Sequence, residues 1–147
     1  MLSKISIAKK LTVPAAEAWQ AIEGFGRLDL WFQGITTCRV EGTGVGAHRY
    51  MTTADGGKIT DLVLEIDATR RQLRYQRLES PFPVTAYQGT VEIFESFDAA
   101  AVVVWTVDFE SRSEVSAAVA KALIAGIGVG IDGMQDDLAA RAATANT

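Results

Sequence analysis

The segment AVVVWTVDFE (residues 101–110), followed by SRSEVSAAVAKALIAGIGVGIDGMQDDL (residues 111–138), decides the fold because its hydrophobic period changes once. Apolar residues alternate through the first part, which is the pattern of a β-strand with one buried face. In the second part they recur every three or four residues, which predicts one amphipathic helix of about 28 residues, roughly 42 Å long. These helical positions are Val115, Val119, Leu123, Ile127, Ile131, Met134 and Leu138.

Upstream of this segment, the period-two pattern repeats between turn residues, which predicts a series of strands. Their expected ranges are residues 36–41, 46–53, 58–67, 71–79, 86–95 and 101–110. The connections are short enough for hairpins and leave no room for crossover helices, so the strands should pair antiparallel.

The N-terminal part predicts one more strand and two short helices. Residues 3–12 alternate like a strand, Pro14 suits the first turn of a helix over residues 15–23, and a second helix follows at residues 28–32. A single sheet needs a layer across its apolar face, and the long C-terminal helix is the element that can supply it. We therefore expect one α+β domain over residues 1–147, with seven antiparallel strands curved around that helix.

Composition excludes several classes of protein. Of 147 residues, 48% are hydrophobic and 22% charged, which suits a globular domain. A net charge of −4 disfavours a nucleic-acid partner. Cys38 is the single cysteine, so neither an internal disulfide nor a cysteine zinc site is expected. The longest apolar or glycine run, residues 122–131, is shorter than the about 20 residues that span a bilayer. We expect a cytoplasmic monomer or homodimer without membrane insertion.

Several short motifs, spread over residues 3–140, carry a family resemblance. They are Trp31, CRVEG at 38–42, GVGAHR at 44–49, DG at 55–56, TD at 60–61, Asp67, Tyr75, PFPV at 81–84 with Tyr87, and Trp105 with Phe109. In order and spacing they resemble the START/birch-pollen-allergen (SRPBCC) superfamily, and more closely its small bacterial polyketide cyclase/dehydrase-like branch. That resemblance implies the helix-grip fold, in which the curved sheet and the long helix enclose an apolar cavity.

The resemblance and the alternation of the strands together imply a set of ligand-binding residues. These are Arg49, Met51, Asp61, Val63, Tyr75, Arg77, Tyr87, Gly89, Trp105, Ile127 and Ile131. The best catalytic candidates among them are Tyr87, Arg77 and Asp61. No metal site and no cofactor is expected.

Arg49 and Asp61 should satisfy one another as a buried pair, which could equally be purely structural. Arg77 would then lack a protein partner and meet a ligand carboxylate, phenolate or enolate, unless a one-residue slip turns it to solvent. Tyr87 beside Arg77 could stabilise an oxyanion, or could be an ordinary core tyrosine. His48 should face solvent.

The long helix contains four glycines, at positions 126, 128, 130 and 133. They either let the sheet approach closely or leave room for a ligand, and we favour cavity volume. The GTGVG run at 42–46 lies between antiparallel strands and does not open a helix, so it is no dinucleotide loop.

Three functions remain open at this point. The first is a binding protein for a small lipophilic molecule, whether polyketide-like, aromatic or lipid. The second is a cofactor-independent cyclase/dehydratase, or a related lyase–isomerase, acting on such a molecule. The third is an interaction module like the heat-shock ATPase-activator relatives. Pairing with Arg49 would lower the pKa of Asp61 and make it a poor general acid, which favours binding over catalysis.

Overall fold

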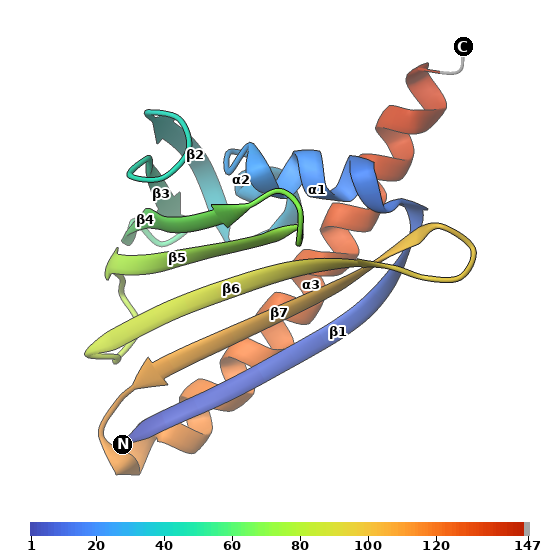
Figure 1. The fold of residues 1–147 in the computed structure, drawn as a ribbon. Helices are drawn as coiled ribbons and strands as arrows, with labels where there is room; N and C mark the ends of the chain where they lie inside the picture. Colours follow the sequence, from blue (N-terminus) through green and yellow to red (C-terminus); the bar gives the residue numbers. More distant parts are fainter. Residues whose placement is uncertain (146–147) are drawn as a thin grey trace.

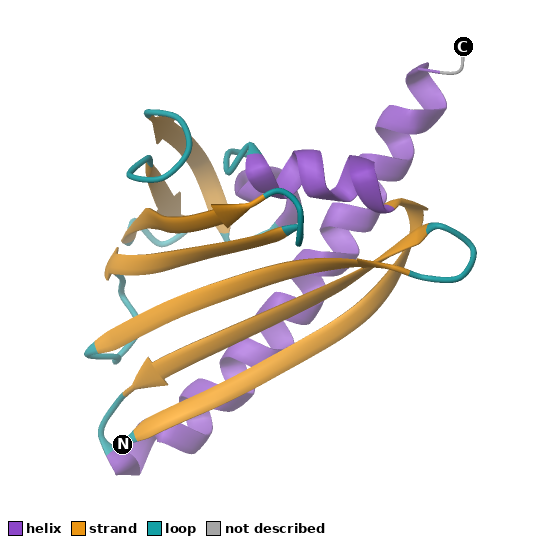
Figure 2. Cartoon of the chain, in the orientation of Figure 1, coloured by secondary structure: helices purple, strands orange, loops and turns teal. Residues whose placement is uncertain are grey.

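The computed structural model describes residues 1–145, which form one curved sheet and three helices (Figures 1 and 2). In chain order the elements are β1 (Leu2–Pro14), α1 (Ala15–Glu23), α2 (Leu28–Trp31), β2 (Ile35–Glu41), β3 (His48–Thr53), β4 (Lys58–Asp67), β5 (Gln72–Glu79), β6 (Ala86–Glu95), β7 (Ala100–Glu110) and α3 (Ser113–Ala145). This is the predicted helix-grip fold, and every strand lies within two residues of its expected range.

All seven strands belong to one sheet with the order β1-β7-β6-β5-β4-β3-β2, in which every neighbouring pair is antiparallel. Strands β2 to β7 follow one another across the sheet in chain order. Strand β1 lies at the edge opposite β2 and pairs with β7 from Leu2↔Glu110 onward. The sheet curls, and α3 runs diagonally across its concave side while α1 and α2 lie over one end (Figure 1). The apolar side chains of each strand therefore point toward the helices.

Helix α3 packs against β1 and α2, but only weakly against β7 and not closely against β4 and β5. The middle of the curved sheet is thus held away from the helix, and the space between them is available for a cavity. The expected cavity therefore has a structural cause, which is the curvature of the sheet around a helix attached at one edge.

The glycines of α3 serve two different purposes. A Cβ at Gly133 would lie 2.2 Å from the backbone oxygen of Trp31, and a Cβ at Gly130 would lie 2.2 Å from the ring of Phe32. A Cβ at Gly126 would meet no atom within 4 Å. The expectation that these glycines provide cavity volume is therefore wrong for Gly130 and Gly133, which let α2 approach α3, and fits Gly126.

An ion pair also joins α2 to α3. Asp137 accepts hydrogen bonds from Arg27 Nε and Nη2, both at 2.8 Å, and from Trp31 Nε1 at 2.9 Å. The hydrogen bond from Arg27 holds the pKa of Asp137 below its usual range, although partial burial acts against this. This contact and the two glycines hold α2 against α3. Helices α1 and α2 together form a plug, meaning the pair of helices that lies over one end of the sheet.

Helix α3 has 33 residues and is longer than the predicted 28. The excess lies at the C-terminal end, where alanine-rich sequence favours helix. The sequence predicts a frayed tail over residues 142–147; of these, residues 142–145 are helical and residues 146–147 lie outside the described part. By length and composition α3 is apolar enough to cross a membrane. In this fold its apolar face is instead buried as the core helix, with Ile131 and Met134 fully covered.

Candidate functional site

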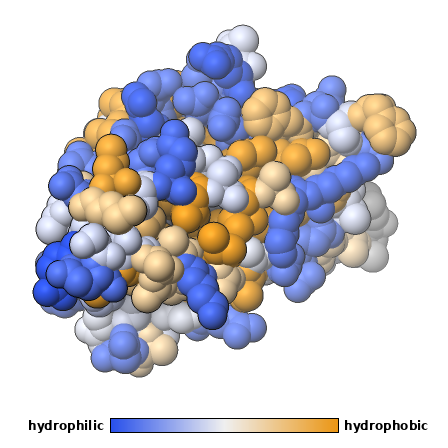
Figure 3. Space-filling model, turned by 90° about the horizontal axis from the view of Figure 1, so that it is seen from below, coloured by the Kyte–Doolittle hydropathy of each residue, from blue (hydrophilic) through white to orange (hydrophobic). Residues whose placement is uncertain are grey.

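A cavity of about 870 Å³ lies between α3 and the concave side of the sheet. Its walls come from the inward faces of β4 to β7, from residues 122–129 of α3, and from three loops near residues 33–35, 53–55 and 81–83. Several lining residues are exposed, among them Gly34, Pro81 and Val129, so the cavity reaches the surface. Apolar residues gather in the middle of the molecule's lower face between polar ones (Figure 3).

The structure brings five of the eleven predicted ligand-binding residues to the cavity wall. These are Tyr75, Arg77, Tyr87, Trp105 and Ile127. The other six are buried but do not line it: Arg49, Met51, Asp61, Val63, Gly89 and Ile131. Arg49 borders a second, much smaller cavity of about 10 Å³.

Three charged side chains form a row across the sheet, and one of them, Arg77, lines the cavity. Asp61 on β4 is opposite Arg49 on β3 and opposite Arg77 on β5. Its carboxylate accepts from Arg49 Nη2 at 2.6 Å and from Arg77 Nε at 2.9 Å. The Asp61 side chain is 0% exposed, and those of Arg49 and Arg77 are 3% and 8% exposed.

The expectation that Arg77 lacks a protein partner is therefore wrong. The resemblance and the alternation of the strands placed Arg49, Asp61 and Arg77 on one face, but they do not tell which residues of neighbouring strands lie opposite each other. The observed register puts Asp61 between both arginines, so one carboxylate is shared by two guanidinium groups.

Both arginines keep the Asp61 carboxylate ionised. Burial alone would raise the pKa of Asp61, but the charges and hydrogen bonds of Arg77 and Arg49 outweigh it and hold the pKa below its usual value. Arg49 is otherwise enclosed by protein, because Phe25 lies over its guanidinium at 3.8 Å and the Phe25 carbonyl accepts from Nη1 at 3.3 Å. Arg77 is the member of the cluster that reaches the cavity.

Three aromatic side chains form the neighbouring part of the wall. The Trp105 Nε1 donates to the Tyr75 hydroxyl at 3.2 Å, and the rings of Tyr75 and Tyr87 lie 6.4 Å apart, centre to centre. The guanidinium of Arg77 lies 4.2 Å from the centre of the Tyr87 ring. Burial raises the pKa of Tyr87 although Arg77 acts in the opposite direction, so its phenol is protonated at neutral pH.

Gly89 has a packing role. A Cβ at this position would lie 2.2 Å from the Tyr75 ring, which occupies the space that a side chain would need. The absence of a side chain at Gly89 therefore sets the position of Tyr75 in the wall, and does not enlarge the cavity.

A protein-family model for polyketide cyclase / dehydrase and lipid transport matches residues 4–143, nearly the whole chain. The chain belongs to this family. No curated protein matches this sequence.

Solved structures share the fold of this family member at low sequence identity. An uncharacterized protein from Bacillus thuringiensis has a TM-score of 0.82 at 20% identity, covering 92% of this chain and 98% of its own. The protein XoxI from Bacillus cereus has a TM-score of 0.81 at 23% identity, covering 92% and 95%. Norcoclaurine synthase from Thalictrum flavum, solved as a point mutant with a transition-state analogue, has a TM-score of 0.76 at 17% identity, covering 96% of both chains.

Sequence reasoning missed the loop residues that line the cavity of this family member. They include Gln33, Asp55 and Phe82. The PFPV motif was visible in the sequence, but loop side chains follow no two-residue alternation, so nothing indicated that Phe82 would point inward. Among residues 1–145 no group of three or more His, Cys, Asp or Glu side chains is placed to hold a metal ion. His48, half-buried, stacks on Tyr50 away from the cavity lining.

Acid should destabilise this polyketide cyclase/dehydrase family member through Asp61 and Asp137, whose pKa values are lowered in the folded state. A lowered folded pKa contributes stability at pH values above the ordinary aspartate pKa of about 3.9, and this contribution is lost as the pH falls through the folded pKa. Urea unfolding at successive pH values should show a falling free energy of unfolding below about pH 5. A constant free energy of unfolding from neutrality down to pH 3 would contradict the lowered pKa values of Asp61 and Asp137.

Proposed function

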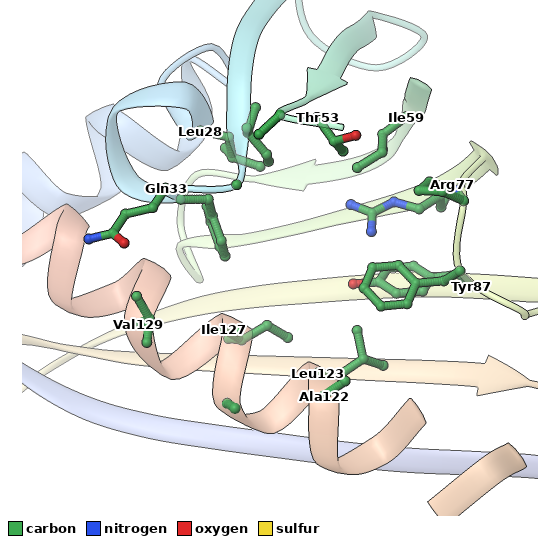
Figure 4. Close-up of a pocket in the computed structure, with 18 of the residues that line it drawn as sticks. Leu28, Gln33, Thr53, Ile59, Arg77, Tyr87, Ala122, Leu123, Ile127 and Val129 are labelled. Carbon is green, nitrogen blue, oxygen red and sulfur yellow. The ribbon is translucent and has the colours of Figure 1, made fainter. Parts of the chain in front are cut away.

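We propose that the protein binds a small lipophilic molecule in the cavity between α3 and the sheet. The observation that carries the proposal is a cavity of about 870 Å³ whose wall is mostly apolar and includes the side chains of Arg77 and Tyr87 next to each other (Figure 4). Cavities of this size and composition are typical of sites that enclose a small ligand. Two comparisons support the proposal. The family's description includes lipid transport. Norcoclaurine synthase from Thalictrum flavum, which shares the fold, has been solved in complex with dopamine and hydroxybenzaldehyde.

A cyclase-like activity is the second candidate, favoured by the contact between Arg77 and Tyr87. A protonated phenol and a fixed cation side by side can stabilise an oxyanion that develops in an enolisable substrate. Turnover would also need a base, and among residues 1–145 the carboxyl group that lines the cavity is that of Asp55. The hydrogen bond from Thr53 lowers the pKa of Asp55, which makes this carboxylate a weak base. Binding is therefore the function that we favour.

Filling the cavity from α3 should abolish binding without unfolding the protein. In Gly126→Phe the new Cβ meets no atom within 4 Å. The loss of a helical glycine favours stability by up to about 1 kcal/mol. We expect the affinity for N-phenyl-1-naphthylamine, a neutral fluorescent probe, to fall about tenfold or more.

The matched control is Ile124→Phe, which adds an aromatic ring to the same helix at a side chain that is 45% exposed and does not line the cavity. This control should bind the probe like the parent, and both variants should keep the parent's melting temperature or exceed it. If Gly126→Phe binds the probe as tightly as the parent, the ligand site lies elsewhere. Mass spectrometry of a ligand released from the protein would separate binding from turnover, because turnover returns a changed molecule.

A further inference from the structure

The charged cluster beside the cavity is not neutral. It contains the two guanidinium groups of Arg49 and Arg77 and the single carboxylate of Asp61. All three side chains are almost fully shielded from water, and the surplus is one positive charge. A buried charge without a counter-charge is unfavourable, so this surplus creates a demand for one anion.

Arg77 is where that demand can be met. Its Nε and Nη2 donate to Asp61, at 2.9 and 3.3 Å. Among the residues that the structure describes, Nη1 has no hydrogen-bond partner, and Arg77 lines the cavity. Figure 4 shows its guanidinium reaching into the cavity from β5, next to the ring of Tyr87. By contrast, Nε and Nη2 of Arg49 donate to Asp61, and its Nη1 donates to the carbonyl of Phe25.

We infer that the ligand is an amphiphilic monoanion, whose anionic oxygen lies against Arg77 Nη1 beside the Tyr87 hydroxyl and whose apolar body lies against α3. This inference rests on the proposed cavity function and specifies its ligand class. A carboxylate, or a comparable oxyanion, would turn the row of Arg49, Asp61 and Arg77 into a balanced set of two positive and two negative charges. A cationic ligand would add a third positive charge to this row, so the Arg77 end of the cavity disfavours it; the one negative side chain of the lining among the described residues, Asp55, lies on an exposed loop.

The attraction is local, because the protein as a whole repels anions. Its net charge is −4, so the general field does not favour an anionic ligand. A preference for an anion in solution must therefore come from a particular positive site, which makes single substitutions informative.

Two fluorescent probes with the same aromatic skeleton test the inference. They are 8-anilinonaphthalene-1-sulfonate, an anion, and neutral N-phenyl-1-naphthylamine. In Arg77→Met the Kd of the anionic probe should rise about ten- to a hundredfold, since a hydrogen-bonded ion contact is lost. The Kd of the neutral probe should stay within about twofold. Arg77→Lys, which keeps the charge, should retain most of the affinity for the anion.

Arg39→Met is the matched control for charge. It removes one exposed arginine, on β2, whose side chain is 62% exposed. This control should leave both probes' Kd values unchanged. Urea unfolding of Arg77→Met without ligand should show at least the parent's stability, because the remaining Arg49–Asp61 pair is neutral.

The possible failures are distinguishable. If the parent binds the neutral probe but Arg77→Met leaves the anion's Kd unchanged, the charge inference is wrong and the cavity function stands. The same conclusion holds if Arg77→Met weakens both probes equally, or if Arg39→Met matches its effect. If the parent binds neither probe, the proposed function fails and the inference fails with it.

Discussion

Asp61→Asn should destabilise the folded protein by at least about 3–5 kcal/mol, which is the usual result of removing one partner from a buried ion pair. The reason is that Asp61 is the counter-ion of two buried guanidinium groups, and the change leaves both without one. An asparagine oxygen can still accept a hydrogen bond but cannot offset the two positive charges. Urea unfolding at neutral pH measures the effect as a lower unfolding midpoint.

Asp108→Asn is the control for this substitution. Asp108 lies on β7 with its side chain 39% exposed and pairs with Lys4 at 3.5 Å. Exposed pairs of this kind contribute about 0–1 kcal/mol, so the control should unfold close to the parent. Equal stability of the Asp61 and Asp108 variants would mean that the charged row in the sheet is not buried in solution.

Gly133→Ala should be the second most damaging change, by about 1–3 kcal/mol or more. The added Cβ would lie 2.2 Å from the Trp31 carbonyl oxygen and 2.9 Å from its Cα, so the backbone of α2 must move. Moving α2 disturbs the plug, where Trp31 is 2% exposed and donates to Asp137. The melting temperature and the tryptophan emission of the variant report this displacement.

Gly126→Ala is the same substitution on the same helix with the opposite expectation. Its Cβ meets no atom within 4 Å, so the gain in helix propensity, up to about 1 kcal/mol, is not offset by a clash. The two variants should therefore shift the unfolding midpoint in opposite directions. Shifts of the same sign and size would show that the contact between α2 and α3 does not limit the position of Gly133.

Hydrophobic periodicity was enough to predict the elements of this fold and their order. The family resemblance and the alternation of side chains along a strand together placed Arg49, Asp61 and Arg77 on one face. They did not predict that Asp61 serves both arginines, since register across strands depends on turns and bulges, such as the irregularity between Thr60 and Asp61. A shift of one residue there would have given Arg77 a different neighbour.

The role of a residue could not be predicted from local sequence pattern where that role depends on contacts between distant segments. Gly126 and Gly133 look alike in the sequence, yet one faces a cavity and the other faces the backbone of α2. The difference comes from where α2 crosses α3, more than 100 residues away along the chain. In the same way, Phe82 lines the cavity from a loop whose path is fixed only by the finished fold.

The attachment of α3 to β1 and α2, away from β4 and β5, divides the cavity between two parts of the chain. Arg77, the charged residue of the buried cluster that lines the cavity, belongs to β5, whereas much of the volume is bounded by residues 122–129 of α3. For the ligand that we propose, substitutions in the helix should therefore change how large a molecule is admitted without altering which end group is recognised. Head-group chemistry and ligand size would then be separately adjustable, both to natural selection and to an engineer.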